Sequence, residues 1–191
     1  MQALNFIKNF LLHPKHTGAI AASSSRLADL ITDCAELTQA ATIVEFGPGT
    51  GVFTEKILKK SPKGALIMAI EFNGEFATMT QKRFPTVHVI HDSATEAKKH
   101  LKTFGKEKCD RIVSGLPWAS FEEDLQNRLL QTVDDILVPG GIFVTFAYLQ
   151  GLLIPAGQRF RKKLKENFVS VGSSRVEWLN APPAFVYIGR K

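Results

Sequence analysis

Three glycines and a carboxylate lie close together in the stretch VEFGPGTGVFTEKILKK, which begins at residue 44. Gly47, Gly49 and Gly51 stand between an apolar run and a run with helical character, where missing side chains let a bulky ligand approach the main chain. Glu45 would repel a pyrophosphate and suits a ligand that carries positive charge. The GxGxG spacing differs from the GxGxxG of dinucleotide-binding turns and disfavours a dehydrogenase. A tight turn without any ligand is the alternative interpretation.

Polar residues also follow the next two apolar runs. Glu71 ends the run ALIMAIE, where a carboxylate can bind both hydroxyls of a ribose. Asp92 and Ser93 end the run VHVIHDSA, where we expect them to border an adenine ring, with Phe72 and Asn73 beside it. A helix cap at Glu71 and an N-cap at Asp92 are the structural alternatives. Together with the glycine turn, these groups favour S-adenosylmethionine as the cofactor.

Short apolar runs alternate with helical patterns along the chain, which predicts a parallel sheet covered on both faces. The expected fold class is α/β: a Rossmann-like, doubly wound, mostly parallel seven-stranded sheet with an antiparallel last strand. The expected strands are 41–47, 65–71, 87–94, 109–117, 142–148, 168–179 and 184–191, and the expected helices are 53–60, 74–84, 94–105, 121–137 and 159–166. In such sheets the ligand lies beyond the carboxyl ends of the strands.

Length and charge narrow the function further. The chain has 191 residues, a hydrophobic content of 45%, a net charge of +6 and a pI near 9.4. These values predict one domain, residues 1–191, with an anionic partner such as RNA, an acidic lipid surface or a phosphorylated substrate. Cys34 and Cys109 are isolated, which predicts no metal site and favours a reducing compartment.

Residues 1–30 are expected to form a helical segment that covers the site or touches a membrane. Their first part, MQALNFIKNFLL, is amphipathic and lacks the features of a cleavable signal peptide. No apolar run in the chain reaches the ~18 residues that a bilayer-spanning helix needs. The expected location is the cytoplasm, either in solution or peripherally at the inner membrane.

Glu45, Glu71 and Asp92 at three successive strand ends, with the GxGxG turn, make residues 43–148 resemble class I S-adenosylmethionine-dependent methyltransferases. The resemblance implies a reaction in which the protein holds an activated methyl donor in line with a nucleophile.

The loop SGLPWASF follows the expected fourth strand, which lies beside the transferable methyl group in that fold. The resemblance therefore places Ser114, Gly115 and Leu116 at the cofactor and Pro117 at the substrate. The loop is similar to the Asn-Leu-Pro-Tyr of ribosomal RNA adenine dimethylases, but Gly115 replaces the asparagine and Trp118 the tyrosine. Because that asparagine would accept a hydrogen bond from a base amine, its loss disfavours a base as the acceptor.

A more extensive resemblance is to the small bacterial phospholipid N-methyltransferases. It rests on HTGAIAASSSRLADLI, VEFGPGTGVFTEKIL, SGLPW, PGGIFVTFAY and NAPPAFVYIGRK, and it covers nearly the whole chain. The resemblance implies stepwise methylation of the amine of phosphatidylethanolamine at a membrane surface. The alternatives are an RNA adenine N6-methyltransferase and a non-catalytic S-adenosylmethionine-binding protein.

Five further residues receive roles in this scheme. His16 is a candidate base, Tyr148 can orient the acceptor, and Trp118 can face the methylated ammonium through a cation–π contact. Arg159 and Arg175 are candidate phosphate ligands, because a planar guanidinium matches phosphate oxygens. The sequence does not indicate whether the protein is a monomer or an oligomer.

Overall fold

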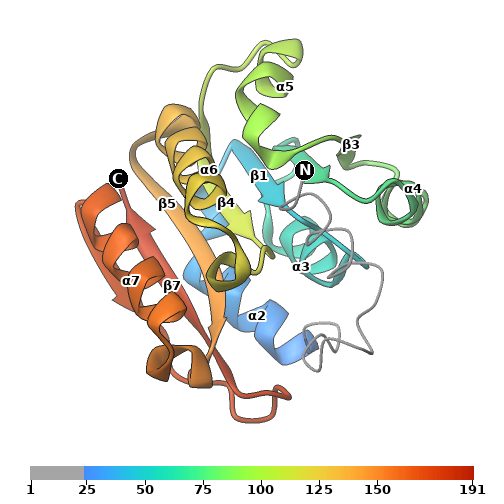
Figure 1. Cartoon of the computed structure of the whole chain (residues 1–191). Coiled ribbons are helices and arrows are strands. Elements are labelled where there is room, and N and C mark those ends of the chain that lie inside the picture. Colours follow the sequence, from blue (N-terminus) through green and yellow to red (C-terminus); the bar gives the residue numbers. More distant parts are fainter. Residues whose placement is uncertain (1–23) are drawn as a thin grey trace.

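The computed structural model describes residues 24–191, which form one seven-stranded sheet with helices on both faces (Figure 1). His16 and most of the expected N-terminal segment 1–30 lie outside the described residues. The strands are β1 Thr42–Phe46, β2 Leu66–Glu71, β3 His88–His91, β4 Cys109–Ser114, β5 Leu137–Tyr148, β6 Ser170–Ser173 and β7 Ala184–Arg190. The α-helices are α2 Ser25–Cys34, α3 Val52–Lys60, α4 Gly74–Arg83, α5 Ala97–Thr103, α6 Glu123–Ile136 and α7 Pro155–Asn167. Four 3₁₀ turns are η1 Leu37–Gln39, η2 Ala94–Glu96, η3 Trp118–Ser120 and η4 Leu149–Leu153.

The strand order is β3-β2-β1-β4-β5-β7-β6, which confirms the predicted Rossmann-like class. β1 pairs in parallel with both β2 and β4, so the chain reverses its direction of travel across the sheet between these neighbours. β5 pairs antiparallel with β7, as expected for the last strand. Ligands bind at such a reversal, beyond the carboxyl ends of the strands. The site is therefore expected where β1, β2 and β4 end.

Two apolar layers hold helices against the sheet. Inward-facing side chains of α5, α6 and α7 pack on one face, and those of α2 and α3 pack on the other. In α6 the predicted stripe Leu125, Leu129, Leu130 and Val133 is buried, as its helical spacing requires. The described end of the N-terminal segment, from residue 24 on, belongs to this packing, because Leu27 and Leu30 of α2 are buried against the sheet.

Several element boundaries differ from the sequence expectations, the largest difference being at β6, which ends at Ser173 and not at residue 179. β5 begins at Leu137, five residues earlier than expected, because Leu137 pairs with Cys109 across an irregularity in the ladder. α7 begins at Pro155, whose fixed φ angle suits the first helical position. Among the described residues, no helix is both long and apolar enough to cross a bilayer.

Candidate functional site

The glycine turn between β1 and α3 is held by its neighbours. All three glycines have positive φ angles, +69° at Gly47, +56° at Gly49 and +81° at Gly51, which other residues rarely adopt. The Gly47 N–H donates to the Ile70 carbonyl in β2 at 2.9 Å. The Gly49 carbonyl accepts a hydrogen bond from the Thr80 hydroxyl of α4 at 2.8 Å. The turn is therefore a preformed surface of main chain, built on β2 and α4.

Space beside this turn is distributed unevenly. A Cβ atom on Gly47 would lie 2.7 Å from Leu116, and one on Gly51 would lie 2.5 Å from Phe84. A Cβ atom on Gly49 would meet nothing within 4 Å. The outer two glycines are thus needed for internal packing, whereas the middle one faces open space that a ligand can fill.

Glu45 is fully buried on β1, one residue before the strand ends. Its Oε2 accepts a hydrogen bond from the Thr54 hydroxyl of α3 at 2.7 Å. Its Oε1 is buried and has no hydrogen-bond partner among the described residues. Burial, with repulsion from the Glu71 carboxylate as a further cause, raises the pKa of Glu45 from an ordinary value of 4.5 to about 8. A buried acceptor without a donor is costly, and a ligand with an ammonium or sulfonium charge would relieve that cost.

Glu71 ends β2 and is also almost completely buried. Its two carboxylate oxygens accept hydrogen bonds from the main-chain N–H groups of Gly49 and Asn73, each at 2.9 Å. Burial raises the pKa of Glu71, and the two N–H groups oppose that change. The structure therefore places Glu71 where a ribose ligand is expected and also makes it a brace for the glycine turn.

The residues expected around the adenine lie at the ends of β2 and β3. Asn73 is the N-cap of α4, and its Oδ1 accepts from the N–H groups of Glu75 and Phe76. Ser93 caps η2 through a hydrogen bond from Thr95. These two side chains thus have capping partners within the chain.

Asp92 is not the cap of η2. Its Oδ2 lies 2.7 Å from Nε2 of His100 in α5, and its Oδ1 accepts from the Ser93 N–H at 2.7 Å. The hydrogen bond with His100 lowers the pKa of Asp92, which keeps the carboxylate ionised. Next to β2, the Phe72 carbonyl lies 3.1 Å from Nε2 of His91. The ends of β2 and β3 therefore present an ionised carboxylate and partly exposed main chain.

The loop after β4 touches the glycine turn directly. A Cβ atom on Gly115 would lie 2.6 Å from the Gly47 carbonyl oxygen and 3.6 Å from that of Phe46. Leu116 packs on Gly47 from the same loop. A side chain at position 115 would therefore force the two loops apart, so glycine is required here by close contact and not by an unusual φ angle.

Trp118 does not match its expected role. The indole is only 2% exposed, stacks on Phe160 with ring centroids 5.2 Å apart, and meets the edge of Phe143. Its N–H donates to the Ser114 hydroxyl at 2.9 Å, and Ser114 itself is fully buried. The expectation of a cation–π contact at Trp118 disagrees with this burial, because Phe160 covers the ring. Pro117 precedes η3 and is partly exposed, which leaves it as a candidate substrate contact.

Tyr148 and the two arginines lie on different parts of the sheet. Tyr148 ends β5, packs against Phe146 at 5.5 Å, and burial raises its pKa. Arg159 is exposed on α7, which covers one face of the sheet. Arg175 follows β6, and its charge opposes the effect of burial on the pKa of Cys34 in α2, which covers the other face. The two arginines are therefore not brought together as a single phosphate clamp.

Three residues that hydrogen-bond to Glu45 or to the glycine turn were not identified in the sequence analysis. Thr54 holds Glu45, and Thr80 holds the Gly49 carbonyl. Arg83 donates to the Thr50 carbonyl at 3.0 Å. Thr54 and Thr80 are fully buried, and their partners Glu45 and Gly49 lie nine and 31 residues earlier in the sequence. The only available signal was therefore a threonine on the inner side of an amphipathic helix.

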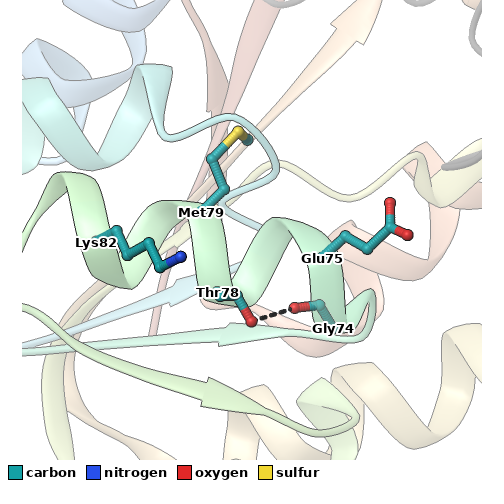
Figure 2. A pocket seen from close by; sticks show the side chains of 5 residues that line it. All are labelled: Gly74, Glu75, Thr78, Met79 and Lys82. Atoms are coloured by element: carbon teal, nitrogen blue, oxygen red, sulfur yellow. Dashed lines mark hydrogen bonds between the residues drawn. The ribbon is translucent and has the colours of Figure 1, made fainter.

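A shallow hollow on the outer side of α4 lies apart from these groups. Figure 2 shows its lining, which consists of side chains and main chain of one helix, Gly74, Glu75, Thr78, Met79 and Lys82. It contains none of the strand-end carboxylates, and the Thr78 hydroxyl is satisfied by the Gly74 carbonyl at 2.8 Å. We assign it no function.

The site fits S-adenosylmethionine by its own chemistry. That cofactor carries positive charge and a ribose, and the site offers the unpartnered Oε1 of Glu45, the strand-end carboxylate of Glu71 and open space beside Gly49. With the strand order, these features define a class: the protein is a class I methyltransferase that uses S-adenosylmethionine.

The comparison with families is more specific. The model of the ribosomal RNA adenine dimethylase family matches residues 15–136, and the chain belongs to that family.

Two kinds of curated relative are similar to this chain. One is an ornithine lipid N-methyltransferase of Singulisphaera acidiphila, 28% identical over 186 residues, which cover 85% of this chain and 97% of the relative. Another is the ribosomal RNA small subunit methyltransferase A of Thermotoga maritima, 34% identical over 87 residues, 44% of this chain and 30% of that relative. The first match runs through nearly the whole relative, and the second through less than a third.

Solved structures agree with the fold. The O-methyltransferase of Bacillus cereus, solved in complex with SAH, superposes with a TM-score of 0.70 at 12% identity and covers all of this chain and 91% of that one. Fibrillarin of Aeropyrum pernix, with natively bound S-adenosyl-L-methionine, superposes with a TM-score of 0.65 at 13% identity over 85% of this chain and 74% of that one.

Proposed function

We propose that the protein transfers methyl groups from S-adenosylmethionine to the primary amine of a membrane lipid, at the membrane surface. Phosphatidylethanolamine and ornithine lipid both present such an amine. The near full-length similarity to an ornithine lipid N-methyltransferase supports this acceptor class. The matches to ribosomal RNA methyltransferases leave most of those relatives' length uncovered, as in the Thermotoga maritima protein.

The observation that carries the proposal is the contact between Gly115 and Gly47. A base-directed loop of the Asn-Leu-Pro-Tyr kind needs an asparagine side chain to accept a hydrogen bond from the planar base amine. Here a Cβ atom at position 115 would lie 2.6 Å from the Gly47 carbonyl oxygen, so no such side chain fits. The rim between β1 and β4 is therefore main chain, which suits an amine on a flexible aliphatic stem.

The residues of the chain supply position and electrostatics to this reaction. When bound, S-adenosylmethionine provides a methyl group on a sulfonium, which leaves as a neutral thioether once the amine nitrogen has taken the methyl carbon. Glu71 would hold the donor by hydrogen bonds, and Glu45 would face its positive charge, which favours the ionised form of that buried carboxyl group. Such alignment of two reactants contributes on the order of 7–11 kcal/mol to lowering a barrier when the geometry is right.

The acceptor amine must lose a proton before it attacks. An alkylammonium has a pKa of about 10 in water, and an apolar surrounding lowers that value because it disfavours the charged form. Phe146 and Tyr148 supply apolar surface at the end of β5. Tyr148 is proposed to orient the amine through its hydroxyl, and His16, outside the described residues, remains a proposed base.

A second candidate function is methylation of adenine in RNA. It is favoured by the family model over residues 15–136 and by the net charge of +6. The proposed lipid reaction and this alternative differ in their acceptor alone, so one assay separates them.

The experiment measures transfer of labelled methyl groups from S-adenosylmethionine to three acceptors in parallel. These are vesicles with phosphatidylethanolamine, vesicles with ornithine lipid, and ribosomal RNA. We expect label in one or both lipids and none in RNA. Label in RNA alone would establish the alternative. Label in no acceptor, with cofactor binding intact by calorimetry, would overturn the lipid proposal and favour a binding protein without activity.

A further inference from the structure

A cluster of exposed apolar side chains lies at one end of the sheet. It comprises Leu153 and Ile154 after β5, and Trp178 and Leu179 between β6 and β7, with exposed fractions of 83%, 47%, 67% and 67%. We call these four residues the apolar tip. Water-exposed side chains of this size, gathered at one end, mark a contact surface more often than scattered ones do.

The two segments of the apolar tip leave the sheet side by side. Tyr148 pairs with Ala184 at the ends of β5 and β7, and the Leu149 N–H donates to the Pro183 carbonyl at 2.9 Å. Figure 1 shows η4 and the β6–β7 connection at the same end of the sheet. Because β5 is parallel to β1 and β4, this is the end at which the glycine turn and the Gly115 loop also lie.

The β6–β7 connection is held in place by its own hydrogen bonds. Glu177 bridges to Ala184, and the buried Asn180 donates to the Pro182 carbonyl and accepts from the Ser24 N–H at the start of α2. These contacts fix both sides of residues 178 and 179. The two side chains therefore project from a constrained loop, which keeps them available to a partner.

Cationic side chains accompany the apolar tip. α7 starts at Pro155, immediately after Ile154, and exposes Arg159, Arg161 and Lys165. None of these three makes an ion pair with another described residue. An apolar surface flanked by unpaired cations is complementary to an anionic bilayer, in which aliphatic side chains enter the acyl boundary and a tryptophan lies at the headgroups.

We propose that the apolar tip, together with the cations of α7, is the surface by which this protein docks on an anionic lipid bilayer. Three of the four tip side chains are aliphatic and offer no ring on which a nucleic-acid base could stack, which favours lipid over RNA. Docking at this end turns the carboxyl ends of the strands toward the headgroups. The inference rests on the proposed function for its biological role, but its test does not require methyl transfer.

Vesicle binding provides the test. Vesicles of phosphatidylglycerol and phosphatidylcholine are mixed with the protein and separated by flotation. We expect the double variant Trp178→Ser with Leu179→Ser to bind about tenfold more weakly than the unchanged protein, since buried apolar area sets interfacial affinity. Val169→Ser is the matched control: Val169 is 89% exposed but lies at the opposite end of the sheet, where its N–H bonds to the Arg190 carbonyl. It should bind as the unchanged protein does.

Tryptophan fluorescence gives an independent signal. The chain has two tryptophans, and Trp118 is 2% exposed, so a change in emission on adding vesicles reports Trp178. We expect a blue shift with anionic vesicles that pure phosphatidylcholine does not produce. Unchanged emission together with equal flotation of the double variant would overturn the proposal. An emission shift produced by RNA but not by vesicles would overturn it too. So would the finding that the unchanged protein is a dimer and the double variant a monomer.

The docking proposal and the proposed function fail separately. If vesicle binding depends on the apolar tip but no lipid is methylated, docking stands and the proposed acceptor falls. If the double variant methylates vesicle lipid as well as the unchanged protein, the acceptor stands and docking falls. Thermal unfolding of both variants should match the unchanged protein, because the substituted side chains are exposed.

Discussion

The two halves of the sheet's carboxyl edge carry different kinds of side chain. At the ends of β1 and β2, the carboxyl groups of Glu45 and Glu71 are buried. Glu71 accepts hydrogen bonds from main-chain N–H groups, Glu45 accepts one from a threonine hydroxyl, and a threonine from α4 fixes the glycine turn. At the ends of β5 and β7, apolar side chains are exposed beside cations of α7. The first half is preorganised for one small ligand. The second half is an open surface, which suits an acceptor that stays in a lipid bilayer. The predictions below test this contrast.

The largest effect is expected from the charge of Glu45. Its folded pKa of about 8 lies above the ordinary 4.5, so between these values the folded state holds a proton that the unfolded state has released. The free energy of unfolding should therefore fall as pH rises from 5 to 8, by on the order of 4 kcal/mol from this group. Glu45→Gln should flatten that slope, measured by urea unfolding at several pH values. Equal slopes for the two proteins would show that the pKa of Glu45 is not raised in the folded state.

Removing the carboxylate of Glu71 should weaken cofactor binding next most strongly. Glu71→Ala deletes two hydrogen bonds to main-chain N–H groups and the proposed ribose contact. A charge-assisted hydrogen bond from a ribose hydroxyl to the carboxylate contributes about 1.5–3 kcal/mol, so loss of the proposed ribose contact should lower affinity about 100-fold in calorimetry. Glu107→Ala, which changes an exposed carboxylate before β4, is the control and should bind normally. Unchanged affinity in Glu71→Ala would show that the ribose lies elsewhere.

Added bulk at Gly115 should destabilise the fold by a smaller amount. Gly115→Ala puts a methyl group against the Gly47 carbonyl and should lower the free energy of unfolding by about 1–3 kcal/mol. Gly172→Ala, where a Cβ atom meets nothing within 4 Å, should change it by less than about 0.5 kcal/mol. Chemical denaturation compares the pair. Equal stability of the two variants would mean that the loops separate freely.

The smallest effect is expected on the cationic side. Arg159→Ala removes one exposed charge from α7 and should lower the binding of anionic vesicles about fivefold at low salt, as a cation near an anionic surface contributes ~1 kcal/mol. The difference should vanish in 0.5 M salt, since the Debye length is then only a few ångströms. Arg128→Ala, an exposed charge on α6, is the control. A difference that persists in high salt would indicate a specific contact.

Local patterns were sufficient to predict most of the fold. The apolar runs located the strands, and the GxGxG turn with Glu71 predicted the end of the sheet at which the candidate site lies, because these signals depend on residues close in sequence. Trp118 was misjudged because its motif position says nothing of Phe160, which covers the ring from a distant helix. Thr80 was missed for a similar reason, since its partner Gly49 lies 31 residues earlier.

The acceptor side was harder to predict for a physical reason. Trp178 and Leu179 lie in a stretch that the sequence analysis took as part of a strand, yet β6 ends at Ser173 and the chain continues as a constrained loop. Whether an apolar residue is buried or exposed there depends on hydrogen bonds to α2 and β7, which a local pattern does not contain.

The main-chain contact between Gly47 and Gly115 has a kinetic consequence. With no side chain between them, the two loops are in direct contact, so a shift of one loop is expected to move the other. Binding of S-adenosylmethionine at the glycine turn is therefore expected to set the position of the Gly115 loop, past which the acceptor enters. We expect an obligatory order of binding, with S-adenosylmethionine first.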